Sequence, residues 1–175
     1  VQYDHVFAQV SQKAGIMPDG WSGSKQELRD DLLSLPGGER LWQTLQGRVY
    51  GPFMKQAGLF PGAASFLMRS RNRGDEVFIV SHKTEYGHFD KTKTLLREAA
   101  LNWMEMQGFF DPRRFGLLKS RVLFASSRQE KVEKIAKKMK EDRSKVALLA
   151  EEKKQRHEKK FGQPRSVLAD TWLAE

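Results

Sequence analysis

The sequence predicts an α/β fold with a helical region first, then a layer of helices and parallel strands, then a long charged helix. Three observations support this prediction. The first sixty or so residues space their apolar side chains as helices do, with no alternating strand pattern. Two apolar runs, 77–80 and 122–125, are separated by a segment with helical periodicity and no hairpin signal, which is typical of parallel strands. Residues 151–160 are almost purely polar.

Three helices are predicted in the N-terminal region. Residues 2–14 carry apolar side chains at helical spacing and are followed by a glycine. A second helix over 24–33 begins with a candidate capping box, in which Ser24 and Glu27 satisfy each other's backbone N–H groups. After a Pro-Gly-Gly break, a third helix is expected over 41–49, ending at the next Gly-Pro pair.

The middle of the chain alternates helices and strands. A short helix over 64–73 precedes the first apolar run, 77–80, and a helix over 90–106 separates it from the second run, 122–125. Bare apolar runs of this length are typical of strands buried in a parallel sheet. A further helix is expected to carry an apolar stripe at Val132, Ile135 and Met139.

Length and composition limit the class of protein. The chain has 175 residues, of which 39% are hydrophobic and 30% charged, values typical of a globular domain with a core. No apolar run approaches the ~18 residues of a transmembrane helix, and no signal peptide is recognisable. The absence of Cys excludes disulfides and thiolate metal sites and fits a reducing compartment. We therefore expect a soluble, cytoplasmic protein with no membrane partner.

The positive charge is concentrated in one segment. The net charge is +9, and residues 128–160 supply +6 of it, from 13 Lys or Arg against 7 Asp or Glu. Such a segment is either a solvated helix face or an arm for acidic partners. A nucleic-acid partner is possible but not favoured, because Trp21, Trp42 and Trp103 lie in apolar settings that indicate packing residues rather than stacking platforms for bases.

Both predicted strands end in hydroxyl residues followed by a cation. The first is followed by Ser81-His82-Lys83-Thr84 and the second by Ser126-Ser127-Arg128. The carboxyl ends of parallel strands meet at one edge of a sheet, where hydroxyls, backbone N–H groups and a cation form an anion cradle. The alternative is that Ser and Thr only cap the next helix. Two such loops together favour a phosphate or carboxylate site.

These residues resemble two motif regions of the haloacid dehalogenase superfamily. The stretch from Leu59-Phe60-Pro61-Gly62 through a short helix to Val77-Phe78-Ile79-Val80-Ser81 is similar to the second motif region, where a strand ends in Ser or Thr. The stretch 121–132 is similar to the third, where a Lys lies near a helix start. The resemblance implies a Rossmann-like parallel sheet core over 59–139, a helical cap subdomain over 1–58 and a charged helical tail over 140–175.

The resemblance also implies roles for individual residues. Ser81 and Lys131 would be catalytic, Ser81 bonding the phosphoryl group of a phosphorylated small molecule and Lys131 neutralising its charge. His82 and Lys83 at the rim of the pocket, together with Arg128, would bind substrate. Enzymes of the family attack with an aspartate to form an aspartyl-phosphate and use Mg²⁺.

The chain departs from the family in its acidic motifs. No apolar strand runs into Asp-x-Asp: Asp4 lacks the preceding strand, and Asp30 lies in a predicted helix. We expect Val1 to lie just after a lost first motif. The acidic pair of the fourth motif is also missing, and Asp170, at the end of a possible strand 166–170, offers one carboxylate as a candidate metal ligand. The nucleophile and the Mg²⁺ ligands therefore cannot be assigned from the sequence.

Two functions follow from these observations. The first is a haloacid dehalogenase-like hydrolase domain, of phosphatase type, that retains the phosphate-binding half of the site and is incomplete or inactive as this chain. The alternative is a noncatalytic binding or adaptor domain whose basic C-terminal helix binds nucleic acid or an acidic protein.

Overall fold

The structure is a computed structural model, and it describes residues 1–89 and 93–143. The chain divides into two units, Val1–Lys131 and Val132–Glu175. The first unit contains all the helices and strands that are labelled below. Residues 128–143 form one more helix, of which residues 128–131 are assigned to the first unit and residues 132–143 to the second.

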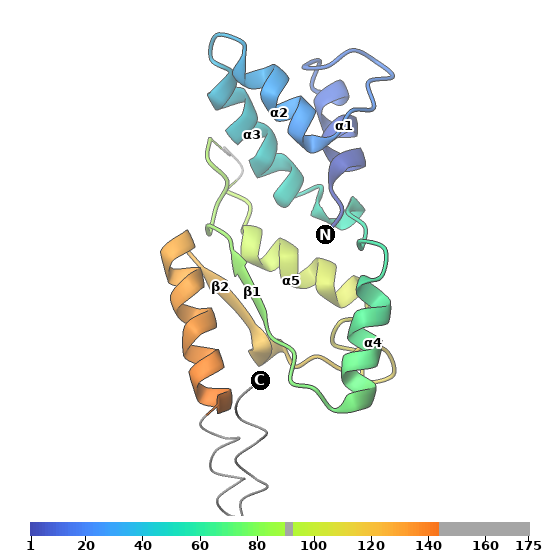
Figure 1. Cartoon of the computed structure of the whole chain (residues 1–175). Helices are drawn as coiled ribbons and strands as arrows, with labels where there is room; N and C mark the ends of the chain where they lie inside the picture. Colours follow the sequence, from blue (N-terminus) through green and yellow to red (C-terminus); the bar gives the residue numbers. More distant parts are fainter. Residues whose placement is uncertain (90–92, 144–175) are drawn as a thin grey trace, which may run out of the picture. The chain divides into compact units, whose positions relative to one another are not determined.

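Helices α1 (Asp4–Lys13), α2 (Lys25–Leu33) and α3 (Gly38–Tyr50) confirm the three predicted N-terminal helices. They pack against one another (Figure 1). The ring of Phe7 on α1 stacks on that of Trp42 on α3, with 5.2 Å between centroids. Each helix buries its apolar stripe in the shared interface, and these side chains are Val6, Phe7, Val10, Leu28, Leu32, Trp42, Leu45 and Val49.

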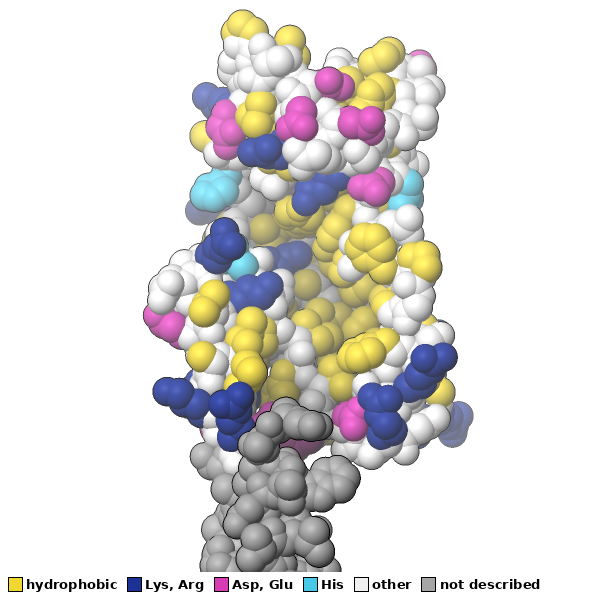
Figure 2. Space-filling view, in the orientation of Figure 1, with side chains coloured by type: hydrophobic (Ala, Val, Ile, Leu, Met, Phe, Trp, Pro, Cys, Tyr) yellow, Lys and Arg dark blue, Asp and Glu magenta, His cyan; other side chains and the backbone are white. Residues whose placement is uncertain are grey.

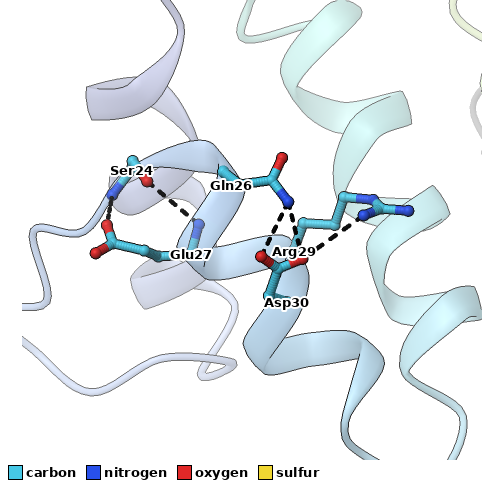
Figure 3. Close-up of polar contacts among 5 residues, drawn as sticks. All are labelled: Ser24, Gln26, Glu27, Arg29 and Asp30. Atoms are coloured by element: carbon cyan, nitrogen blue, oxygen red, sulfur yellow. Dashed lines mark hydrogen bonds and ion pairs between the residues drawn. The ribbon is translucent and has the colours of Figure 1, made fainter.

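The capping box predicted at the start of α2 is confirmed (Figure 3). The Glu27 backbone N–H donates to Ser24 Oγ at 3.2 Å, and the Ser24 N–H donates to Glu27 Oε2 at 2.7 Å. The bond from the Ser24 backbone stabilises the charged carboxylate and lowers the pKa of Glu27. One turn on, Asp30 accepts a bond from Gln26 at 2.9 Å and pairs with Arg29 at 3.6 Å.

The middle of the chain forms a mixed α/β arrangement. Its elements are η1 (Met54–Gln56), α4 (Ala63–Arg73), β1 (Ile79–His82), α5 (Leu96–Met106), η2 (Lys119–Arg121) and β2 (Val122–Ala125). The two strands lie side by side in Figure 1 and pair in parallel, in a register that runs from Ile79 opposite Val122 to His82 opposite Ala125. The prediction of parallel strands separated by a helix is confirmed, and the sheet in the described residues has two strands.

Three details differ from the sequence prediction. Strand β1 begins at Ile79 rather than Val77, because pairing starts opposite Val122, the first residue of β2. Helix α5 begins at Leu96, so residues 93–95 of the predicted helix over 90–106 are not helical, and residues 90–92 lie outside the described part of the chain. At the start of α5 the backbone N–H of Leu96 donates to the carbonyl oxygen of Glu85 at 2.8 Å. The strands are half-buried rather than buried, because each has a single neighbour in the described sheet.

One apolar core extends from the N-terminal helices to the strands. Trp103 on α5 is 1% exposed, and its indole Nε1–H donates to the Ala57 carbonyl at 2.7 Å. Its ring lies 5.6 Å from that of Phe109, measured between centroids. The prediction that Trp42 and Trp103 are packing residues is confirmed by their burial.

Residues 128–143 are helical. The predicted stripe of Val132, Ile135 and Met139 is present at helical spacing, and its side chains are exposed. Residues 144–175 lie outside the described part of the chain, and with them the candidate strand 166–170 and Asp170.

Candidate functional site

A cavity of about 440 Å³ opens where β1 ends and the first turn of the following loop begins. The end of β1, the loop that follows it and α3 contribute most of its wall, together with one residue from the chain start and one from α5. The lining residues are Tyr3, Gln43, Gln46, Gly47, Tyr50, Ser81, His82, Lys83, Thr84, Gly87, His88 and Leu96. Because these residues come from distant parts of the sequence, the cavity is a product of the tertiary fold.

The strand pairing positions three consecutive candidate residues at this cavity. Ser81 and His82 are the last two residues of β1. Lys83 extends the ladder by one bond, since its backbone N–H donates to the Ala125 carbonyl at 2.9 Å. Its own carbonyl accepts a bond from Arg97 Nε at 3.1 Å. The backbone of this segment is therefore fixed on both sides.

Lys83 is the one buried charged residue in the described part of the chain, and its side chain contributes to the cavity wall. It is 9% exposed, and its Nζ lies 5.2 Å from the centroid of the Tyr50 ring, within cation–π distance. Burial disfavours the charged form and lowers the pKa of Lys83 from 10.5 to about 8. The side chain is therefore mostly a cation at neutral pH. The sequence alone places Lys83 at the rim of a pocket, whereas the structure buries it.

Another part of the cavity wall consists of aromatic and amide side chains. Tyr3 and Tyr50 meet edge to face with 5.1 Å between ring centroids, and the Tyr3 hydroxyl donates to Met54 Sδ at 3.2 Å. Burial, and then the neighbouring Tyr50, raise the pKa of Tyr3, so this phenol stays neutral. Gln43 and Gln46 on α3 add amide donors and acceptors to the wall.

The sequence analysis missed these wall residues from the helical region. A signal was present: Gln43, Gln46 and Tyr50 recur at i, i+3 and i+7, which places them on one face of α3. A polar stripe of this kind is ordinarily a solvated helix face. Only the packing of α3 against the rest of the first unit turns it into a cavity wall.

The end of β2 serves mainly to start the next helix. Ser127 Oγ accepts a bond from the Glu130 backbone N–H at 3.0 Å, which is a helix cap. Ser126 Oγ accepts a bond from Arg97 Nη2 at 2.8 Å, and its carbonyl lies 3.2 Å from His82 Nε2. For Ser127 the helix-capping alternative is thus observed.

Arg128 and Lys131 do not line the cavity. Arg128 is exposed and Lys131 is half-buried. The backbone N–H of Lys131 donates to the Ser127 carbonyl at 3.1 Å, within the first turn of the helix. The structure therefore brings together Ser81, His82 and Lys83 and leaves the two later cations outside the wall of this cavity.

The acidic candidates are engaged elsewhere. Asp4 Oδ1 accepts a bond from the Lys25 backbone N–H at 3.1 Å, and Asp30 contacts Gln26 and Arg29 on α2 (Figure 3). Within residues 1–89 and 93–143, no three His, Asp or Glu side chains lie together as metal ligands would. The described residues therefore do not fit the Mg²⁺ that the resemblance implies, and we derive no step through it.

Among the described residues that line the cavity, Lys83 carries the charged side chain. None of its lining residues in the described part of the chain is Asp or Glu. On the face drawn in Figure 2, Lys, Arg and His side chains, with acidic ones beside them, lie next to apolar side chains at the level between helices α1–α3 and the strands. No helix among the described residues is long and apolar enough to span a membrane.

No family model, curated protein or solved structure matches this chain.

Proposed function

We propose that the cavity at the end of β1 binds the phosphoryl group of a small phosphorylated molecule. The observation that carries this proposal is the buried cation of Lys83 in a wall with no acidic side chain among the described residues. A buried ammonium without a counterion is costly, and an anion in the cavity would offset that cost. Phosphate matches the donors present, because Ser81 offers a hydroxyl and Lys83 a compact positive charge.

The remaining lining residues could contact the organic part of a phosphorylated molecule. His82 and Thr84 flank the two main donors. The Tyr50 ring and the Gln46 amide lie on α3, and together they offer an apolar surface and hydrogen-bonding groups to an organic moiety. The ligand would therefore be a phosphorylated compound rather than phosphate alone.

The wider proposal is a haloacid dehalogenase-like domain. The parallel pair β1 and β2 would belong to a Rossmann-like sheet, with α1 to α3 as its cap. The position of Ser81 at a strand end and the cavity between that end and α3 support this assignment. In such a domain this chain would bind phosphate esters, and hydrolysis would be minimal without an identifiable nucleophile.

Phosphate affinity tests the binding site. We expect Ser81→Ala and Lys83→Met each to weaken inorganic phosphate about tenfold in isothermal titration at low salt and neutral pH, because each removes a bond to a charged ligand. Lys131→Ala should change affinity less than about threefold, since Lys131 does not line the cavity and acts only as a distant, screened charge.

Two exposed residues provide matched controls for these variants. Ser65→Ala on α4 and Lys55→Met on η1 make the same chemical changes at exposed positions that do not line the cavity, and we expect both to leave phosphate affinity unchanged. Unaltered affinity in Ser81→Ala would refute the binding site. A loss in Lys131→Ala larger than in Lys83→Met would instead favour the roles implied by the family resemblance.

Turnover tests the enzymatic half of the proposal. We expect negligible hydrolysis of an aryl phosphate in the presence of Mg²⁺, because Ser81 and Lys83 can bind and polarise a phosphate but form no aspartyl intermediate. The measurement is release of the aryl alcohol. Turnover near ~1 s⁻¹, within the usual enzyme range, that disappears in Lys131→Ala would contradict this expectation. Asp170, Asp4 and Asp30 should then be replaced one at a time to find the nucleophile.

A further inference from the structure

The amine of Lys83 differs from other lysine amines in its surroundings. Lys119 and Lys138, for comparison, pair with Glu105 and Glu141 at 2.6 Å. Lys83 is buried, faces the Tyr50 ring and lies in a cavity wall without Asp or Glu among the described residues. A carboxylate holds a lysine in its protonated form, and within this wall that influence is absent.

The cavity also gives small molecules access to the amine. Its volume of about 440 Å³ exceeds the space that a few heavy atoms occupy. Fixed bonds to Ala125 and Arg97 hold the Lys83 backbone, so the side chain reaches the cavity from a rigid base. A buried, desolvated amine beside an open volume is a setting in which lysines form Schiff bases.

We propose that Lys83 is a covalent capture site for small aldehydes. The lone pair of the unprotonated Nζ attacks the carbonyl carbon, the nitrogen then releases one proton, and the carbonyl oxygen takes one up. The resulting carbinolamine loses that oxygen as water, with one hydrogen coming from Nζ, and a C=N bond remains. One amine and one aldehyde thus give one imine and one water, with no oxidant or reductant.

The titration of Lys83 supports this chemistry. A pKa of about 8 leaves roughly a tenth of the amine unprotonated at neutral pH. The fraction for an ordinary lysine is about 300-fold smaller. The other titratable groups of the wall are Tyr3, Tyr50, His82 and His88. The cation of Lys25 lies 5.6 Å from the Tyr50 ring centroid. None of these side chains is a carboxylate. The Tyr50 ring, within cation–π distance of Nζ, favours the protonated amine, but burial outweighs it, because the pKa of Lys83 is lowered.

Reductive labelling tests the proposal. The protein is treated with propanal and cyanoborohydride at neutral pH, and peptide mass spectrometry follows the modification of each lysine. Hydride traps the imine as a secondary amine. We expect Lys83 to be modified at least about tenfold faster than the exposed Lys13 and Lys55, and this preference to vanish in denaturant. Propanal carries no phosphate, so the result does not depend on phosphate binding.

The pH profile provides an independent readout. The labelling rate of Lys83 should rise with pH and level off above about pH 8, where most of its amine is unprotonated. The exposed Lys55, labelled in the same samples, is the comparison. A Lys83→Arg variant, checked for folding by circular dichroism, should lose the fast site and keep the slow ones. Labelling of Lys83 no faster than Lys55, or with the same pH profile, would overturn the proposal.

Discussion

Replacing Trp103 with Ala is expected to lower the free energy of unfolding by about 4 kcal/mol. The side chain is 1% exposed and packs against Phe109. It also links α5 to the segment after η1 through its bond to the Ala57 carbonyl. The substitution leaves a cavity the size of an indole and an unpaired buried carbonyl. Urea denaturation followed by circular dichroism measures the change.

Two further variants separate the contributions to this loss. Trp103→Phe keeps most of the apolar volume and removes only the indole N–H, so we expect it to cost about 1–2 kcal/mol. Leu35→Ala, at a side chain that is 51% exposed, should change stability by less than about 0.5 kcal/mol. If Trp103→Ala costs no more than Leu35→Ala, the proposed continuity of the core through α5 is wrong.

The helices could be predicted because their signals are local. Ser24 and Glu27 define the start of α2 within four residues of sequence, and both bonds form as expected. Gly74 ends α4 with a φ of 75°, a conformation that glycine adopts at little cost. Neither signal depends on a distant part of the chain, so the sequence contained all the information needed.

The strand limits and the start of α5 depend on distant partners. Ile79 begins β1 because Val122 lies opposite it, and nothing in the run 77–80 distinguishes residue 77 from residue 79. Helix α5 is delayed by the isolated bridge between Tyr86 and Leu95. Such pairings are chosen by the tertiary structure and are invisible to a reading of spacing alone.

In the candidate site, too, some residues could be found from local sequence signals and others depend on distant parts of the chain. Ser81, His82 and Lys83 could be found because they end a recognisable strand, and the site of a parallel sheet lies at that edge. The contribution of Gln46 and Tyr50 could not be found, because only packing brings α3 to that edge. The burial of Lys83 was equally hidden, since its sequence neighbours are all polar.

Burial of Lys83 implies that the site is maintained at a cost in stability. We expect Lys83→Met to raise the free energy of unfolding by about 3 kcal/mol at neutral pH, from a shift of 2.5 between the ordinary pKa of 10.5 and about 8 in the fold. Methionine fills a similar volume without a charge. A variant that gains stability while losing phosphate is the pattern expected of a functional group in an unfavourable environment.

The pH dependence of this gain identifies its cause. The pKa of Lys83 is lower in the folded chain than in the unfolded one, so below about pH 8 both states are protonated and the native state bears the full desolvation cost. Between pH 8 and 10.5 the unfolded chain binds the extra proton, and the stability of the unmodified protein therefore rises with pH toward that of Lys83→Met. Urea denaturation at a series of pH values should show the difference closing across this window, with Lys55→Met as a control that shows no such trend. A gain of equal size at neutral pH and above pH 10.5 would mean that added apolar contact, and not removal of a buried charge, stabilises the variant.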